Sequence, residues 1–296
     1  MSIVETTGLG RRYGSTWALR DADLTLPEGR LIALIGPNGA GKSTLLNMLV
    51  GLTEPTTGTI TVLGGHPAGS PAALDGIAFV AQDMPLYRNL TVGDMIHLTR
   101  NLNVTFDASR ARARLAELGI SEKQKAGKLS GGQRAQLALS LALARHPRLL
   151  VLDEPTAPLD PLARHEFMAT VMTAMAEDGI SVVLSSHLLA ELERVADHLV
   201  LVAAGRVRVD GPIGDLLDQH RLITSPTSTV RHLDGCEVIE TTSTGAQTHR
   251  LVRRTELVAA LPADAESRAV GIEELTLGYF RNDTPRPAPV LTGVSR

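Results

Sequence analysis

A glycine-rich stretch that follows an apolar run constrains the fold more than any other feature of this sequence. Residues 36–44 read GPNGAGKST and match the pattern G-x-x-x-x-G-K-[ST]. The apolar run RLIALIG leads into them, and an apolar pattern typical of a helix follows. A buried strand, a phosphate-cradling loop and a helix N-terminus in this order predict an α/β fold that binds a nucleotide.

The residues of this loop have separate expected roles. Glycines let backbone N–H groups turn toward phosphate oxygens, and the helix N-terminus adds positive potential. The Lys42 ammonium is expected to reach the β- and γ-phosphates, and the Ser43 hydroxyl to bind Mg²⁺. The predicted nucleotide-binding loop comprises Gly36, Pro37, Asn38, Gly39, Ala40, Gly41, Lys42, Ser43 and Thr44.

An acidic pair closes a second apolar run, RLLVLDE at residues 148–154. At the end of a buried strand, Asp153 is placed to hold Mg²⁺ through water. Glu154 is placed one residue further on to polarise an attacking water as a general base. Two ordinary acids at a strand end are the alternative, which the phosphate loop disfavours.

A second glycine-opened helix start lies at residues 129–134, LSGGQR. Free N–H groups of a first helical turn and the Ser130 hydroxyl would form a second anion site there. On these residues alone, a flexible helix start is an equally simple interpretation. The question is what a second anion site binds when the first loop already holds the ligand.

Composition narrows the class of protein. A net charge of −3 and a pI near 6.3 argue against an electrostatic nucleic-acid partner. With Cys236 as the single cysteine, a disulfide within the chain is impossible, and a reducing cytoplasmic setting is expected. The apolar runs are far shorter than the ~18 residues that span a bilayer, so direct insertion into a membrane is not expected.

The order of patterns predicts the domain organisation. Short apolar strands alternate with helices around a helix-rich insertion at about residues 84–146, which indicates a mainly parallel sheet. Ser- and Thr-rich texture begins after residue 222, and prolines cluster near the end. We expect a main domain at residues 1–220, a small C-terminal unit at 221–282 and a flexible tail at 283–296.

Taken together, the motifs resemble the nucleotide-binding subunit of an ATP-binding cassette (ABC) transporter over about residues 3–217. LSGGQ resembles that family's signature motif, and it precedes the acidic strand as it does there. The resemblance implies a P-loop NTPase cassette with an antiparallel edge sheet and a small α+β C-terminal appendage. It implies hydrolysis of ATP with Mg²⁺, and two cassettes paired head to tail, as a homodimer or with a paralogue.

The pairing answers the question of the second anion site. In the family, ATP lies between the phosphate loop of one cassette and the signature motif of the other. The residues implied to bind the partner's ATP are Ser130, Gly131, Gly132, Gln133 and Asp160. Asp160 resembles the D-loop aspartate, although Ala157 and Pro158 depart from the usual SGLD form, and the proline could stiffen the loop.

Three further positions carry over by resemblance. Gln82 matches the Q-loop glutamine, which contacts Mg²⁺ and the membrane partner. His187 matches the switch histidine that senses the γ-phosphate. Tyr13 matches the aromatic residue that stacks on adenine, with Trp17 as a nearby competitor.

The resemblance also predicts what the ATPase drives. A motor docked on a separate transmembrane permease subunit, at the inner face of the cell membrane, is expected from the single cassette and the segment 83–95, DMPLYRNLTVGDM. The pattern is similar to exporters of drugs, antibiotics or lipid-linked glycans, and GIEELTLGYF at 271–280 fits such subunits. An importer subunit and a soluble ABC ATPase acting on ribosomes or DNA are the alternatives.

Overall fold

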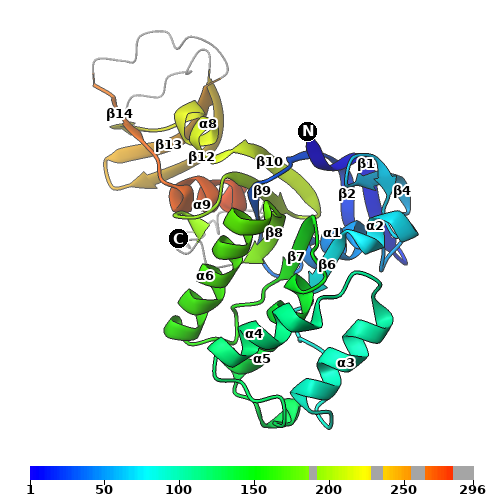
Figure 1. Ribbon diagram of the computed structural model, residues 1–296. Helices are drawn as coiled ribbons and strands as arrows, with labels where there is room; N and C mark the ends of the chain where they lie inside the picture. The colour runs from blue at the N-terminus through cyan, green and yellow to red at the C-terminus, as the bar shows by residue number, and fades with distance from the viewer. Residues whose placement is uncertain (187–191, 228–235, 255–263, 283–296) are drawn as a thin grey trace, which may run out of the picture. The chain divides into compact units, whose positions relative to one another are not determined.

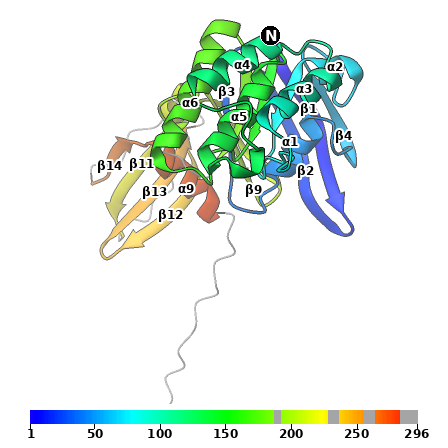
Figure 2. The same ribbon diagram turned by 60° about the horizontal axis from the view of Figure 1, so that its bottom comes forward.

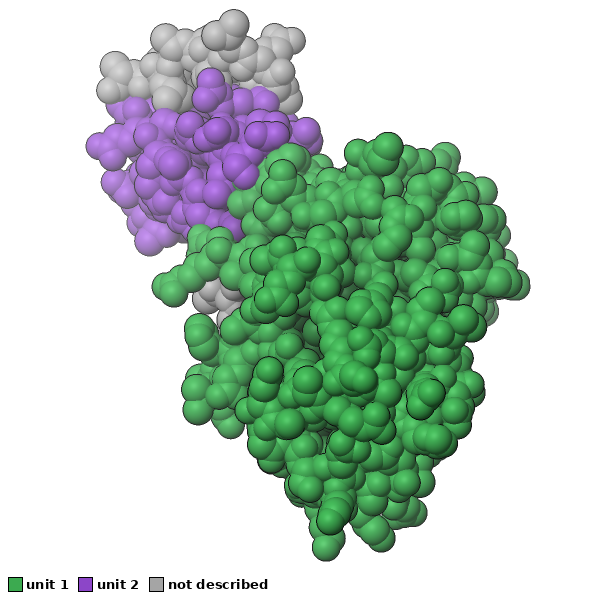
Figure 3. Space-filling view, viewed as in Figure 1, with its two compact units in different colours: residues 1–213 green, residues 214–296 purple. Residues whose placement is uncertain are grey.

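The computed structural model describes residues 1–186, 192–227, 236–254 and 264–282. The chain divides into two compact units, Met1–Ile213 and Gly214–Arg296, which Figure 3 colours separately. None of the helices in the described ranges combines the length and apolar character that a membrane span requires.

A mainly parallel sheet forms the centre of the first unit (Figure 1). Its order is β10-β9-β3-β8-β7-β6, and β10 alone in this sheet runs antiparallel to its neighbour. Every residue of β3 and β7 is buried, because such strands are covered on both faces and therefore read as continuous apolar runs. The strands are β3 (Leu31–Ile35), β6 (Ile77–Val80), β7 (Leu149–Asp153), β8 (Ser181–Ser186), β9 (His198–Ala203) and β10 (Arg206–Pro212).

A second, antiparallel sheet has the order β2-β1-β4-β5. Helix α1 contacts β2 and β4 of this sheet and β7 of the central one. One hydrophobic core therefore joins both sheets through α1, which begins at the phosphate loop. The elements are β1 (Ser2–Tyr13), β2 (Thr16–Pro27), α1 (Lys42–Leu49), β4 (Thr57–Val62), β5 (His66–Pro67) and α2 (Pro71–Asp75).

The predicted helical insertion has a hydrophobic core of its own, built from residues between Val92 and Ala144. Figures 1 and 2 show α3, α4 and α5 gathered together, and α5 contacts β6 at the edge of the central sheet. Two of these helices open with reciprocal capping boxes, Thr91 with Asp94 and Ser130 with Gln133. The elements are α3 (Val92–Leu102), α4 (Ala108–Glu117), the 3₁₀ turn η1 (Ala126–Lys128) and α5 (Gly131–Leu143).

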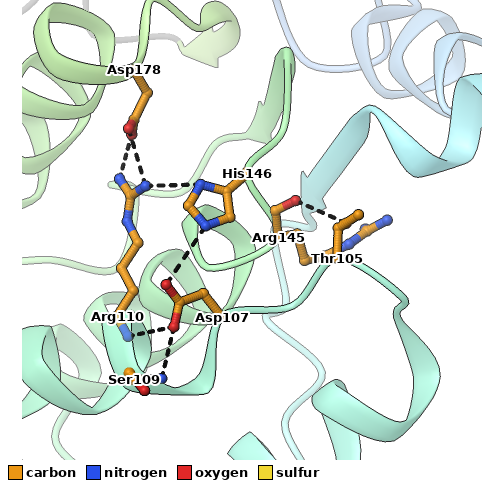
Figure 4. Close-up of polar contacts among 7 residues, drawn as sticks. All are labelled: Thr105, Asp107, Ser109, Arg110, Arg145, His146 and Asp178. Atoms are coloured by element: carbon orange, nitrogen blue, oxygen red, sulfur yellow. Dashed lines mark hydrogen bonds and ion pairs between the residues drawn. The ribbon is translucent and has the colours of Figure 1, made fainter.

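A polar cluster ties the insertion to α6 (Pro161–Asp178) of the central layer (Figure 4). The Arg110 guanidinium of α4 binds both carboxylate oxygens of Asp178 and donates to His146 Nδ1 over 3.2 Å. Asp107 caps the start of α4 by accepting from the Ser109 and Arg110 amides at 2.9 and 3.0 Å. This α4–α6 link (Arg110, His146 and Asp178) joins segments far apart in sequence.

The second unit is a four-stranded antiparallel sheet with helices. Its order is β12-β13-β11-β14, and α9 packs so closely on it that a Cβ at Gly278 would lie 2.2 Å from Leu251 Cδ2. Buried His220 sits between the Leu216 carbonyl and the Tyr279 hydroxyl, at 2.6 and 3.0 Å. The elements are α8 (Ile213–Gln219), β11 (His220–Pro226), β12 (Cys236–Thr244), β13 (Gln247–Arg254), β14 (Glu266–Ala269) and α9 (Ile272–Asn282).

Candidate functional site

The phosphate loop connects β3 to α1, and its glycines are required by close backbone contacts. Gly41 caps α1 with φ 110°, in the region that L side chains rarely adopt. A Cβ at Gly41 would lie 2.4 Å from the Ala18 carbonyl oxygen, and one at Gly36 would lie 2.3 Å from that of Val202. The loop is thus held against β2 and β9 by contacts that leave no room for a side chain.

Lys42 is buried at the first position of α1. Its ammonium donates to the Gly36 carbonyl at 2.8 Å and lies 3.2 Å from Glu154 Oε1. Both side chains of this ion pair are largely shielded from water, so removing either partner alone would leave an uncompensated charge. Sequence reasoning named both residues but not their direct contact.

The acidic pair is arranged by a serine of the neighbouring strand. The Ser185 hydroxyl donates to Asp153 Oδ1 at 2.6 Å and accepts from the Glu154 amide at 2.9 Å. Glu154 has a φ of 44°, a backbone conformation that costs about 1–3 kcal/mol for a non-glycine residue. Ser185 was missed in the sequence, where the only signal is a polar pair ending the apolar run SVVL.

A single open pocket of about 690 Å³ brings most of the predicted nucleotide-site residues together. Gln82 enters it from the segment after β6, opposite the start of α1. The lining residues are Ala18, Asn38, Gly39, Gly41, Lys42, Ser43, Thr44, Gln82 and Glu154. Gly36, Pro37 and Ala40 belong to the loop but do not line the pocket, and Asp153 is buried behind it.

The donor set of this pocket fits a hard cation that is bound together with a nucleotide. The described residues include no group of three or more His, Cys, Asp or Glu side chains that could hold a metal alone. Mg²⁺ in nucleotide sites takes one or two protein oxygens and completes its shell with phosphates and water. The Ser43 hydroxyl and the Gln82 amide of the pocket lining offer oxygens of this kind, and the second Asp153 oxygen offers one from outside the lining.

The signature residues form a different pocket, of about 320 Å³. Ser130, Gly131, Gly132 and Gln133 line it at the start of α5, and Asp160 lines it at the start of α6. The Ser130 hydroxyl already has a partner within the helix start, because it accepts a hydrogen bond from the Gln133 amide at 3.2 Å. It can still donate to an anion. In the described chain the two pockets share no lining residue.

The hairpin β1–β2 separates Tyr13 from its competitor. Tyr13 pairs with Thr16, and Trp17 pairs with Arg12, so the two aromatic rings project from opposite faces of the hairpin. Ala18, at the register shift that follows in β2, lines the nucleotide pocket. Tyr13 is not among the described residues that line the pocket, and about half of its surface is exposed. His187 lies outside the described residues.

The known proteins that are similar to this chain include ATP-binding subunits of transporters. The model of the family described as "ABC transporter" matches residues 19–157. A sulfate/thiosulfate import ATP-binding protein, CysA, of Mycobacterium tuberculosis is 34% identical over 270 residues, covering 88% of this chain and 75% of that protein. A Nod factor export ATP-binding protein of Rhizobium johnstonii is 32% identical over 246 residues, covering 80% and 74%.

A solved dimeric structure of an ATP-binding cassette in a post-hydrolysis state, bound to ADP and Pi, is also similar. Its TM-score is 0.63 at 25% identity, with 71% of this chain and 98% of that chain covered. These likenesses confirm the predicted P-loop cassette fold with its mixed sheets and helices. The chain belongs to the ABC transporter family, as an ATP-binding subunit that hydrolyses ATP.

Proposed function

We propose that the pocket between the phosphate loop, Gln82 and Glu154 is the hydrolytic half-site of this cassette. The observation that carries the proposal is the convergence of Lys42 and Glu154, from the ends of two buried elements, on one side of the pocket. Lys42 and the loop amides bind phosphate oxygens and neutralise charge that develops during transfer. Glu154 accepts a proton from the attacking water.

Further residues prepare the site. Ser43, Gln82 and Asp153 hold Mg²⁺, which when bound neutralises the phosphates and orients them. The Ser185 hydroxyl binds one Asp153 carboxylate oxygen. This hydrogen bond holds the Asp153 side chain in one rotamer, so the orientation of the second oxygen is fixed as well. Tyr13 stacks on the adenine base. His187 remains a predicted γ-phosphate sensor.

The second pocket completes the site of a partner cassette. Ser130, Gly131, Gly132 and Gln133 present a first helical turn and a hydroxyl, which suit a phosphate. Asp160, at the start of α6, lines the same pocket, so one chain supplies both groups of residues that would contact the partner's ATP. Their separation from the phosphate-loop pocket supports a head-to-tail pair, because a chain cannot close its own two half-sites.

A groove beside the helical insertion is the proposed docking place for a transmembrane permease. It measures about 240 Å³, and its lining includes Phe79, Met84, Pro85, Leu86 and Leu141, together with the polar Thr99, Asn103 and Arg145. Tyr87 next to it is 63% exposed, which suits a protein contact. An apolar segment of the permease, lying against the inner face of the membrane, would fill the groove.

The transport direction that we propose is export of a drug-like or antibiotic-like compound. The Nod factor export relative matches across most of this chain, including part of the C-terminal unit. Import is the second candidate, because the sulfate/thiosulfate import relative covers a larger share, 88%.

Substitution of the proposed base tests the hydrolytic assignment. Glu154→Gln should keep ATP binding, lower turnover by about 10²–10⁴-fold and accumulate an ATP-dependent dimer by light scattering. Glu117→Gln, an exposed acid at the end of α4, is the matched control and should behave as wild type. Normal turnover of Glu154→Gln would remove Glu154 from the role of base.

Docking and direction can be tested by tagged purification from gently solubilised native membranes. A polytopic membrane protein should be recovered in near-equal amount, and Tyr87→Ala should reduce its recovery. Leu52→Ala, at a residue that is 68% exposed elsewhere, should not. ATP-driven accumulation of substrate by inside-out vesicles would support export, and recovery with ribosomes or DNA-repair proteins instead would contradict a transport role.

A further inference from the structure

The Tyr13 ring is covered on one face by an arginine of its own strand. The Arg11 guanidinium carbon lies 4.9 Å from the centroid of the Tyr13 ring, within the range of a cation–π contact. Arg11 Nη1 also donates to the Glu54 carbonyl at 2.8 Å. The guanidinium is therefore held at two points, and the Tyr13 side chain beneath it is about half exposed.

Hydrogen bonds of the backbone near Arg11 also join β1 to the segment that follows α1. The Thr56 amide donates to the Gly10 carbonyl at 2.7 Å, and the Arg12 amide donates to Thr56 Oγ1 at 3.1 Å. Helix α1 begins at the phosphate loop and is about 12 Å long at a rise of ~1.5 Å per residue. Arg11 thus connects the aromatic ring, through Glu54, to the segment that follows the helix carrying Lys42.

A second arginine–aromatic pair lies on the other face of this hairpin. Arg12 stands over the Trp17 ring with 5.6 Å to its centroid. This pair has the same chemistry and sits one residue along the chain, but its ring lies on the opposite face of the hairpin from Tyr13. Substitution of Arg12 therefore serves as a control, because it removes a positive charge near the hairpin tip without changing the contact between Arg11 and Tyr13.

We infer that Arg11 is a positioning residue for the nucleobase of ATP, acting through Tyr13. The guanidinium occupies one face of the ring and locks its orientation, so the base stacks on the opposite face with little ordering left to lose on binding. The inference rests on the proposed stacking of adenine on Tyr13. It adds that base affinity depends on a residue that does not touch the base.

The test compares ATP with inorganic triphosphate, which offers the phosphate loop the same charge but has no base. Dissociation constants of both are measured by competition against a fluorescent ATP analogue. Arg11→Ala should weaken ATP binding by about two- to fivefold and leave the affinity for triphosphate unchanged. Arg11→Lys should recover part of the loss, because it keeps a cation without the planar face. Arg12→Ala should change neither ligand.

Tyr13→Ala separates failure of this inference from failure of the stacking assignment. It should weaken ATP by about fivefold or more, again without changing triphosphate. If Tyr13→Ala leaves the ATP-to-triphosphate ratio intact, stacking on Tyr13 is wrong and Arg11 loses its route of action. If Tyr13→Ala changes the ratio but Arg11→Ala does not, or if Arg11→Ala weakens both ligands equally, the positioning role alone is overturned.

Discussion

At the scale of single residues, the position of the two acids depends on one hydroxyl group. Ser185 is fully buried, and it both donates to Asp153 and accepts from the Glu154 amide. Its removal would free an Asp153 oxygen and leave the Glu154 amide, at a residue with a strained φ, with only the Ser185 carbonyl at 3.2 Å as a partner. The side chain is therefore expected to matter for turnover more than for nucleotide affinity.

Ser185→Ala should lower kcat by about tenfold, since hydrogen bonds to charged groups are worth about 1.5–3 kcal/mol. The dissociation constant for ATP should change much less. Ser181→Ala is the matched control, because Ser181 is buried at the other end of β8 and also accepts one amide, that of Gly29, at 2.8 Å. Steady-state kinetics of both variants test this role. Equal losses of kcat would mean that the Ser185 substitution acts by destabilising β8 and not by displacing Asp153 and Glu154.

The sequence could predict the pocket-lining residues of the phosphate loop but not the contacts that arrange them. Lys42 and Glu154 each follow a local pattern, a glycine loop after a strand and an acid ending an apolar run. Their ion pair and the Ser185 bridge join positions 112 and 31 residues apart, respectively. Such pairings depend on strand order, which local periodicity does not determine.

At the scale of elements, helix starts were predictable because their signals are local. Thr91 with Asp94, a spacing typical of an N-cap, forms a reciprocal cap, and Ser130 with Gln133 forms another that was not predicted from the sequence. The α4–α6 link was not predictable, since Arg110 and Asp178 are separated by 68 residues and belong to different layers. This link fastens the helical insertion, which has its own core, to the layer that carries Asp160.

A double-mutant cycle on Arg110→Ala and Asp178→Ala should give a coupling free energy of about 1 kcal/mol. The readout is hydrogen exchange of α4 amides, which reports local opening rather than global unfolding. The Arg112–Glu122 pair of the same insertion, at 3.2 Å and nearly half exposed on both sides, is the control and should couple weakly. Coupling no larger than in that control would mean that the link does not hold α4 in place.

At the scale of the whole molecule, the second unit contains a buried histidine, His220, that makes the stability of this unit depend on pH. Burial lowers the pKa of His220, and burial raises the pKa of Tyr279 to about 12. The Leu216 carbonyl can only accept, so neutral His220 carries its hydrogen on Nδ1 and accepts from Tyr279 through Nε2. Arg253 nearby also lowers the pKa of His220, and Glu237 raises it.

Because the folded pKa of His220 lies below the unfolded value, the unfolded state takes up a proton first. The contribution of neutral His220 to the free energy of unfolding is fully present above the unfolded pKa of about 6.5, and it declines as the pH falls below that value. Opening free energies of β11 and β13 amides, from hydrogen exchange between about pH 7 and pH 5, should therefore decrease on acidification. His220→Phe should abolish the decrease; its persistence in that variant would assign it to other groups.

Residues rich in Ser and Thr predicted a separate C-terminal unit from residue 221, and the structure divides the chain between Ile213 and Gly214, at the start of α8. The transported compound could not be read from the sequence, and import and export relatives align with similar identity. The shared cassette binds nucleotide, whereas contacts to cargo would lie in the permease.

Among the described residues, the phosphate-loop pocket and the signature pocket share no lining residue, which has a genetic implication for the proposed head-to-tail pair. In a head-to-tail pair, a chain with a defective signature pocket disables its partner's phosphate loop, although that loop is intact. For a chain that pairs with itself, equal synthesis of sound and defective copies would leave roughly a quarter of the pairs with two sound sites. An allele altered at Ser130 would then impair the intact phosphate loop of a wild-type partner, whereas one altered at Glu154 would impair only its own loop's site.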